Sequence, residues 1–287
     1  MFITKIKNAD GEMLTLSENT DKYVVASIIG LNPPKAQVNI TNLVGADGGM
    51  YNSSFMGTRN IVITLMLRGD QEAARKELME YFRSKGLCTF YFQNGNINAY
   101  IEGYVESIEY NIFQRTEEMQ ISIICPDPYF HGLTQYVIPM TGTTPLFNFE
   151  FAIDADDPVE LSTYDSSPVT TIMNDSQADS GLTFVAKFVS SASSISFQNL
   201  DTWESVNLSY SFLADDILMY STMGDDVVFT LERGASIANM FPNTYLGDVD
   251  IMTIHPGENN FGYSIDNSNN SSKADLVLIY RSCYQGV

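Results

Sequence analysis

Alternation of apolar and polar residues is the strongest pattern in the first half of the chain. Between residues 59 and 68, Ile61, Ile63, Leu65 and Leu67 occupy every second position, as in a strand that buries one face. Three further segments, at 88–92, 100–110 and 118–124, are rich in aromatic and β-branched residues, which favour strands. This half is therefore predicted to form a β-sandwich-like domain.

One segment of this half has helical spacing instead. An apolar stripe runs along residues 70–85 at intervals of three and four: Ala74, Leu78, Tyr81 and Phe82. Asp70 is a good N-cap, and Arg83 and Lys85 fall where cations favour the end of a helix. Gly86 suits the residue that follows the end. The pattern predicts one amphipathic helix at about 70–85, lying on a sheet.

The second half has no comparable helical stretch. Short strand-like segments alternate with turn-rich ones and lie at 182–189, 194–197, 206–212, 226–231, 249–254 and 274–280. Strands spaced in this way predict an antiparallel β-sandwich or jelly roll. The fold class expected for the whole chain is therefore mainly β, with a single helix.

Size and charge narrow the classes of function. The chain has 287 residues, with 35 acidic residues against 15 basic ones and a net charge of −20. A specific nucleic-acid binder needs a basic face, and an anionic membrane attracts the same kind of surface. The longest nearly apolar stretch, at 23–31, is too short to cross a bilayer. Neither nucleic acid nor membrane is an expected partner.

The charges also divide the chain. Residues 1–150 carry a net charge of −5 and residues 151–287 a net charge of −15. The segment 140–145 is small, polar and contains Pro145, as linkers often do. We therefore expect an N-terminal domain at 1–140, a linker at 141–150 and a C-terminal domain at 151–287.

A search for catalytic residues finds few candidates. His131 and His255 are the only histidines, and neither is accompanied by a nucleophile motif. The three cysteines, Cys88, Cys125 and Cys283, are far apart and form no metal-binding or redox pair. The many acidic pairs are expected on solvated loops without any function. We therefore expect no enzymatic activity and no cofactor.

Binding motifs are equally weak. The acidic run at 154–157 begins like a calcium loop but continues into Pro158 and Val159, so no metal is expected. The glycine-rich segment at 45–49 lacks the lysine and spacing of a phosphate-binding loop and is interpreted as a connector between strands. Trp203 is the only tryptophan and hence the only candidate for a tryptophan sugar platform, although a core position is the favoured interpretation.

Several motifs punctuated by glycine and proline occur in a fixed order along the chain. Their defining residues are Gly30, Pro33, Pro34, Gly48, Arg59, Pro126, Pro128, Phe130, Pro256, Gly257, Asn259 and Gly286. Together with the strand–helix–strand block after Arg59, this order resembles the distal tail protein family of siphophages, which are long-tailed bacteriophages with non-contractile tails. The resemblance covers nearly the whole chain.

This resemblance implies a structural role. The N-terminal domain would close with its copies into a hexameric ring, and the C-terminal sandwich would resemble galectins or carbohydrate-binding modules. The ring would join the tail-tube protein to the tail-associated hub or fibre protein at the virion tail tip, after synthesis and assembly in the cytoplasm of the bacterial host. A negatively charged ring suits the passage of DNA through its channel, because acidic surfaces repel phosphate.

The alternative function is a glycan-binding adhesin whose C-terminal sandwich contacts host cell-wall saccharide. The galectin-type ligand pattern of His, Asn and Arg is not visible, because Arg233 and Arg281 are the only arginines after residue 150. A docking scaffold is therefore favoured over a lectin. A glycoside hydrolase or esterase is the least supported class.

Ring formation requires surfaces that meet a neighbouring subunit. The strands at 100–110 and 118–124 form either an arm that pairs across subunits or an ordinary internal hairpin, and the residues leave both open. The tip of this hairpin falls at 111–117. Phe113 is unusual at an exposed tip, so Phe113 and Arg115 are predicted to contact a neighbouring subunit.

Overall fold

The computed structural model describes most of the chain as two compact units. The first unit comprises residues 1–134 and 283–287, and the second comprises 135–282. The described residues are 3–16, 20–45, 47–113, 117–145, 162–165, 169–224, 226–245, 247, 249–266 and 273–287. Of the expected linker at 141–150, the structure describes 141–145, which includes the short strand β11 (Gly142–Pro145).

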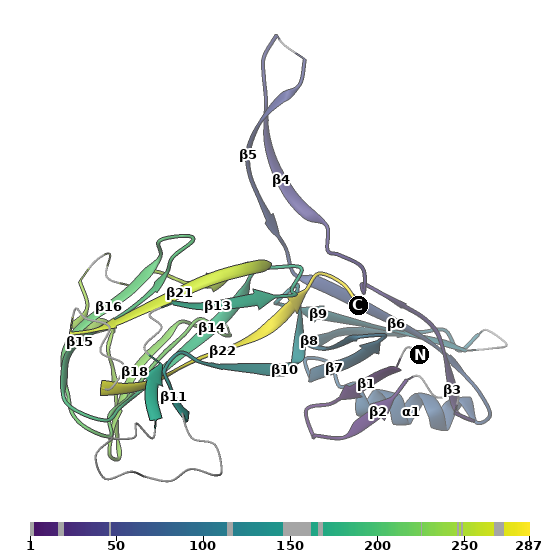
Figure 1. The fold of residues 1–287 in the computed structure, drawn as a ribbon. Coiled ribbons are helices and arrows are strands. Elements are labelled where there is room, and N and C mark those ends of the chain that lie inside the picture. Colours follow the sequence, from purple (N-terminus) through teal and green to yellow (C-terminus); the bar gives the residue numbers. More distant parts are fainter. Residues whose placement is uncertain are drawn as a thin grey trace, which may run out of the picture. The chain divides into compact units, whose positions relative to one another are not determined.

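An antiparallel sheet forms most of the first unit (Figure 1). Its strands lie side by side in the order β3, β6, β9, β8, β7, β1 and β2, and β10 pairs with the first part of β8. Their bounds are β1 (Ile3–Lys7), β2 (Met13–Thr15), β3 (Tyr23–Ile29), β6 (Arg59–Leu67), β7 (Leu87–Asn94), β8 (Ile97–Tyr110), β9 (Glu118–Cys125) and β10 (Phe130–Pro139). The four strands predicted in this half are confirmed.

Alternation explains which side of this sheet is buried. Ile61, Ile63 and Leu65 are fully buried, and their cross-strand neighbours on β9 point to the same side. The helix α1 (Gln71–Tyr81) packs into this core through Ala74 and Leu78. The sheet therefore has one core face, covered in part by the helix, and one outer face.

The helix is shorter than its sequence predicts. Asp70 is the N-cap and accepts from the Ala73 N–H, as expected, but the helix ends at Tyr81, before Arg83 and Lys85. Tertiary contacts stop it: the Tyr81 hydroxyl donates to the Ile6 carbonyl at 2.6 Å, and the Lys85 N–H donates to a β8 carbonyl. Lys85, rather than Gly86, adopts the left-handed conformation, with φ of 68°.

The second unit contains two packed antiparallel sheets. One has the order β19, β18, β17, β14 and β22, with β20 also on β14, and the other has β13, β21, β15 and β16. Their bounds are β13 (Val169–Asn174), β14 (Ser180–Phe188), β15 (Ala192–Asn199), β16 (Ser205–Phe212), β17 (Ile217–Ser221), β18 (Val228–Arg233), β19 (Ser236–Asn239), β20 (Thr253–Ile254), β21 (Gly257–Ile265) and β22 (Ala274–Tyr284). A separate pair joins β11 to β12 (Ser162–Asp165).

Aromatic rings from both sheets of this unit meet in its core. Phe184 on β14 stacks on Phe197 of β15, with ring centroids 4.4 Å apart, and Phe261 on β21 meets Phe184 edge to face. A mainly β, antiparallel architecture with one α-helix among the described residues is thus confirmed, whereas the resemblance to galectins stays a prediction. The segment predicted as a strand at 249–254 forms only the two-residue β20.

Candidate functional site: the arm and the Arg59 junction

Among the strands that the structure describes, one β-hairpin of the first unit pairs with no other strand. It consists of β4 (Ala36–Asn42) and β5 (Gly49–Met56), which form a two-stranded sheet of their own (Figure 1). We call residues 36–56 the arm. Gly45 and Gly48 form its turn with φ of 83° and 95°, values that glycine adopts at low cost. The predicted connector at 45–49 is thus the tip of a long hairpin.

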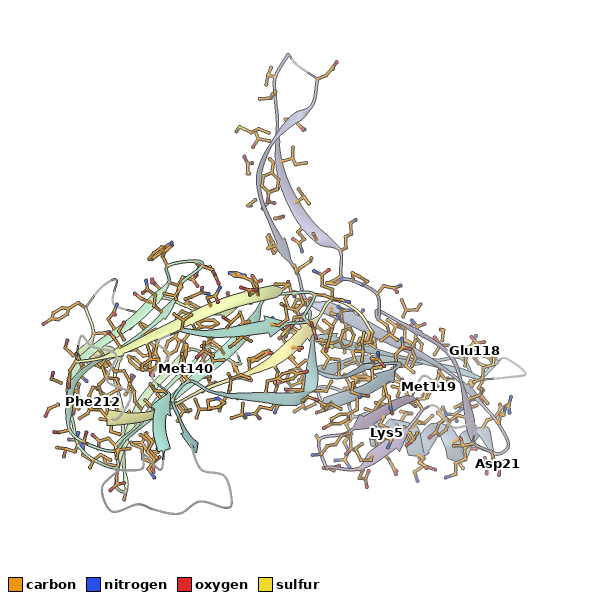
Figure 2. All side chains as sticks on the ribbon, viewed as in Figure 1. Lys5, Asp21, Glu118, Met119, Met140 and Phe212 are labelled. Atoms are coloured by element: carbon orange, nitrogen blue, oxygen red, sulfur yellow. The ribbon has the colours of Figure 1, made fainter. Side chains whose placement is uncertain are left out.

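Side chains on both sides of the arm are exposed (Figure 2). Many are large and apolar: Val38, Ile40, Leu43, Val44, Met50, Tyr51 and Phe55, each at least half exposed. An isolated two-stranded hairpin is marginally stable in water, and a large exposed apolar surface is typical of a protein interface. The arm therefore has the composition of an element that another surface covers.

Polar contacts within the arm keep its two strands in register. The Asn39 amide donates to the Ser53 hydroxyl at 2.9 Å, and the Asn52 amide donates to the Thr41 hydroxyl at 2.7 Å. Asp47 is the only charged residue between 36 and 57. Exposed edge strands normally carry charges that prevent pairing with other chains, and the arm carries none along its strands.

Arg59 lies at the base of the arm and is almost completely buried, with 3% exposure. Its guanidinium donates to four backbone carbonyls from three parts of the chain: Gly30, Asn32, Pro128 and Gln285, at distances of 2.5–2.8 Å. The Phe130 ring lies under it, with 4.4 Å between Cζ and the ring centroid. We call this arrangement the Arg59 junction.

The junction satisfies a buried cation without an ion pair in the described part of the chain. Burial lowers the pKa of Arg59, while the nearby Cys125 and Asp127 act in the opposite direction. The planar guanidinium presents five donors in fixed directions, so it can join several carbonyls that a lysine could not reach together. Arg59 therefore connects the chain entering the arm, the turn before β10 and the chain's last residues.

Two glycines make this close packing possible. Gly30 has φ of 97°, and a Cβ there would lie 2.1 Å from the Asn60 carbonyl oxygen. A Cβ on Gly286 would lie 2.9 Å from the Leu31 oxygen, next to the hydrogen bond that the Val287 N–H donates to that same oxygen. Both positions therefore require glycine because the backbones of two segments touch.

Beside the junction, His131 joins the last strand to the turn before β10. Its Nε2 lies 2.7 Å from an Asp127 carboxylate oxygen, and its Nδ1 lies 3.5 Å from the Cys283 sulfur. Burial lowers the pKa of His131, but the contacts with Asp127 and Cys283 outweigh it and raise the pKa to about 10. Cys283 is buried, so this cluster serves to hold the two segments together.

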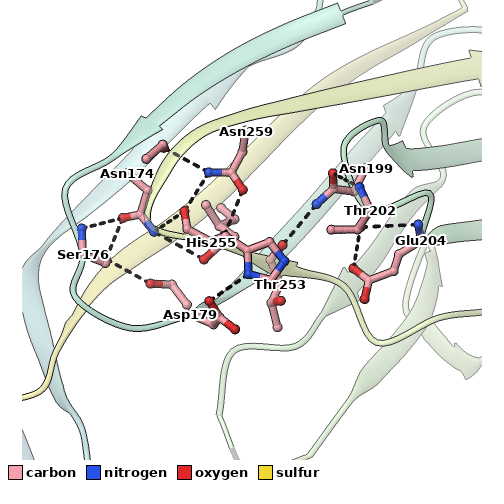
Figure 3. A network of polar contacts seen from close by, with 12 residues as sticks. Asn174, Ser176, Asp179, Asn199, Thr202, Glu204, Thr253, His255 and Asn259 are labelled. Carbon is pink, nitrogen blue, oxygen red and sulfur yellow. Dashed lines mark hydrogen bonds and ion pairs between the residues drawn. The ribbon is translucent and has the colours of Figure 1, made fainter.

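Buried amides shape the turns of the second unit (Figure 3). The Asn174 side chain donates to the carbonyls of Ile254 and His255, and the Asn259 side chain accepts from the His255 N–H at 2.9 Å. Gly257 has φ of 97°. His255 itself pairs with Asp179 at 2.8 Å on the exposed side. The Pro256–Asn259 motif is thus a turn fixed by satisfied amides.

Trp203 is exposed, contrary to the core position favoured by the sequence. It is 73% exposed and has φ of 65°, an unusual conformation for a bulky residue. The buried Asn199 holds this turn, since its side-chain oxygen accepts from the N–H groups of Asp201 and Thr202. Asp201 also binds Asn260 of the neighbouring strand at 2.7 Å. The tight turn that Asn199 holds places the Trp203 ring in solvent. The composition of the chain did not indicate this exposure.

Comparison with solved structures identifies the architecture. The crystal structure of SPP1 Dit (gp 19.1) matches with a TM-score of 0.67 and 13% identity, over 98% of this chain and 98% of that chain. This chain has the Dit fold. The phage P2 baseplate in its activated conformation contains a chain with the same fold, with a TM-score of 0.50 and 13% identity over 97% of this chain and 98% of that chain. No protein-family model matches the sequence, and no curated protein matches it.

Within this Dit fold, most of the motif residues of the first unit gather at one place. The residues in or against the junction are Gly30, Pro33, Arg59, Pro128, Phe130 and Gly286. Pro34 lies where the chain enters the arm, Pro126 lies in the turn before β10, and Gly48 lies at the arm tip. The motif residues of the second unit, at 256–259, belong to its amide network.

The other residues that the sequence singled out are the predicted subunit contacts and the acidic run. Phe113 is 92% exposed at the tip between β8 and β9, whereas Arg115 and the acidic run at 154–157 lie outside the described residues. Among the residues that the structure describes, no three His, Cys, Asp or Glu side chains are arranged to hold a metal ion. No helix of the described ranges is long and apolar enough to cross a membrane.

Proposed function

We propose that this protein is a structural hub of a phage tail tip. Six copies close into a ring that joins the tail-tube protein to the tail-associated hub or fibre protein, in a virion assembled in the bacterial cytoplasm. The Dit fold supports this proposal, because SPP1 Dit is described as a paradigm of the hub adsorption apparatus in phages that infect Gram-positive bacteria. The sequence motifs support the same family.

The observation that carries the proposal is the arm. It exposes apolar side chains on both faces, which is unfavourable in a lone subunit, and it lacks the charges that keep edge strands apart. A neighbouring subunit that covers the arm removes this surface from water. The Arg59 junction fixes the base of the arm, so the arm leaves each copy from the same rigid point.

Charge supports the passage of DNA through the ring. The chain carries a net charge of −20, and the region at 1–150 is itself net negative. A channel bounded by acidic subunits repels phosphates and lets DNA slide without being bound. This role needs no bond-making chemistry and no cofactor.

The experiment is a measurement of mass in solution with and without the arm. We expect the full chain, alone or with its tail-tube neighbour, to form a particle six times the 32.0 kDa subunit mass. A variant with residues 37–55 replaced by a short Gly-Ser turn should fold but stay monomeric. A full chain that stays monomeric with its tail neighbours, or an arm-deleted chain that still forms the ring, contradicts the proposal.

A second candidate function, glycan binding, is favoured by Trp203. Trp203 is exposed on the same turn as Asp201, so it offers a flat apolar surface near a carboxylate in sequence, a combination that suits a sugar ring. The test is saturable binding of the full chain to a panel of purified Gram-positive wall polysaccharides, compared with Trp203→Ala. Equal binding by both proteins, or binding by neither, removes this candidate.

A further inference from the structure

A groove of about 500 Å³ lies on the outer face of the sheet in the first unit, across β2, β1, β7, β8 and the start of β10. Its principal lining residues are Lys5, Lys7, Met13, Tyr91, Gln93 and Leu133. The register explains why they meet: Lys5 lies opposite Tyr91, and Lys7 lies opposite Met13. We call this feature the β1 groove, and Lys5 marks its position in Figure 2.

Lys5 and Lys7 are the charged side chains among the described residues that line the β1 groove. Both side chains are exposed, and neither takes part in an ion pair among the described residues. The chain has more than twice as many acidic as basic residues, so an unpaired pair of lysines on one face is uncommon here. The groove thus combines positive charge with the apolar surface of Met13, Tyr91 and Leu133.

The tip of the arm has the complementary chemistry. Asp47 is the sole charge of the arm, and it lies in the turn between β4 and β5. Leu43 and Val44 precede it and are 50% and 105% exposed. The tip therefore presents one carboxylate beside two apolar side chains, which matches two ammonium groups beside an apolar groove.

We propose that the β1 groove receives the arm tip of a second copy of this chain. Asp47 of the incoming arm lies between Lys5 and Lys7, and Leu43 and Val44 cover the apolar part of the groove. None of the described arm residues lines the groove of its own chain. This inference rests on the proposed ring, for which it names the contact between neighbouring copies.

The arm extends well beyond its base. The strand β5 has eight residues, which span about 27 Å in an extended antiparallel strand. Each copy then offers one arm and one groove at different places on its surface, so the contact is head-to-tail. A head-to-tail contact repeats from copy to copy and forms a closed ring when the rotation closes.

A nucleic acid fits the groove less well. Binding to a phosphate backbone usually relies on many basic contacts, and the groove offers only two lysines. Its remaining surface is apolar and amide, which suits a peptide segment. A second copy is favoured over another protein because the complementary tip occurs on this chain itself.

A charge exchange tests the contact. Asp47→Lys alone and the pair Lys5→Glu with Lys7→Glu should each raise the concentration needed for half-assembly about tenfold, because like charges then meet. The triple variant restores opposite charges and should assemble within about threefold of wild type. Lys76→Glu, on the exposed side of α1, changes the net charge without touching the groove and should assemble normally. Analytical ultracentrifugation measures each.

Crosslinking gives a second measurement that does not depend on affinity. A chain with Asp47→Cys and Lys7→Cys, treated with a short bismaleimide, should give covalent oligomers up to the size of the ring. The native cysteines are buried, and burial raises the pKa of Cys88 to about 11 and that of Cys125 to about 12, so they react slowly. A pair of Asp47→Cys and Lys76→Cys is the control and should give no oligomers.

The outcomes separate this contact from the ring itself. If the wild-type chain stays monomeric even with its tail neighbours, the proposed ring fails and the contact fails with it. If the wild type forms a ring but Asp47→Lys and the pair Lys5→Glu with Lys7→Glu assemble normally, and no crosslink forms at position 7, only the β1 groove assignment is overturned. Restored assembly of the triple variant together with the Lys7 crosslink supports the contact.

Discussion

Two hairpins of the first unit, β8–β9 and β4–β5, are built in similar ways and have different surroundings. Each is antiparallel, and each contains one register shift, after Val105 and after Asn39. The strands β8 and β9 also pair with β7 and β6, so their apolar face is buried. The arm has no such neighbours among the strands that the structure describes, and it is exposed on both faces. Hairpin formation is local, but burial depends on the rest of the sheet.

The largest expected effect is at Arg59, where the sheet meets the base of the arm. Arg59→Ala removes a buried guanidinium that four backbone carbonyls bind and should lower the free energy of unfolding of the first unit by about 4 kcal/mol. Hydrogen exchange of the β6 amides measures this loss of unfolding free energy. Arg68→Ala, at an exposed position just after β6, is the control and should change little. A loss below about 1 kcal/mol at Arg59 contradicts the junction's role.

Removing the same side chain from each hairpin tests the comparison directly. Ile121 on β9 is fully buried, so Ile121→Ala should destabilise the first unit by about 3 kcal/mol. Ile40 on the arm is 57% exposed, so Ile40→Ala should change the subunit's stability by less than about 0.5 kcal/mol while weakening assembly. Urea unfolding and sedimentation measure the two effects. Similar losses of subunit stability would show that the arm is packed within its own chain.

Two glycines in left-handed conformations distinguish the base of the arm from its tip. At Gly30 a new Cβ would overlap the Asn60 carbonyl, whereas at Gly48 it would meet nothing within 4 Å. Gly48→Ala should cost about 1 kcal/mol for backbone strain alone, and Gly30→Ala about 2 kcal/mol or more. Thermal unfolding of both variants under identical conditions checks the order. The reverse order would contradict the close packing at the base.

A pH effect is expected in the sheet but not in the arm. Because the folded-state pKa of His131 is raised from about 6.5 to about 10, protonation of this residue stabilises the fold. The contribution, on the order of 1 kcal/mol, is complete below about pH 6.5 and is lost as the pH rises towards 10. Urea midpoints between pH 6.5 and 10 measure it. In His131→Gln this decline should be smaller, and an identical decline would exclude His131 as its source.

The smallest effect on folding is expected at the tip of β8–β9. Phe113 is 92% exposed, so Phe113→Ala should change subunit stability by less than about 0.5 kcal/mol. We expect it to weaken oligomerisation more than folding. Size-exclusion chromatography and thermal melts compare the two, and equal losses in both would refute a contact role for Phe113.

The sequence predicted four sheet strands of the first unit, β6 to β9, because their apolar and polar residues alternate or their residues favour strands. The run from Ile61 to Leu67 buries every second residue, as expected. It did not predict the end of α1, because a hydroxyl contact from Tyr81 to a distant strand decides where that helix stops. The residues at Arg83 and Gly86 favour a later helix end, but contacts with distant strands end the helix at Tyr81. Such contacts cannot be read from the spacing of apolar residues.

The candidate site was only partly predictable. Gly30, Arg59, Pro128 and Gly286 were each singled out as structural, but their meeting at one guanidinium depends on segments up to 226 residues apart. The arm was missed, because the turn glycines at 45–49 indicate only a connection between strands. Its lack of strand charges was the one available signal. The exposure of Trp203 was missed as well, since a single tryptophan is usually buried.

The amino-acid sequence by itself determined the mainly β class, the position of four strands in the first half, the start of the helix and the resemblance to distal tail proteins. These features depend on period, composition and short motifs, which are local. The tertiary structure decided which hairpin is the arm, which carbonyls bind Arg59 and where the β1 groove forms. Such features depend on strand neighbours and on contacts between distant segments, and no local pattern specifies them.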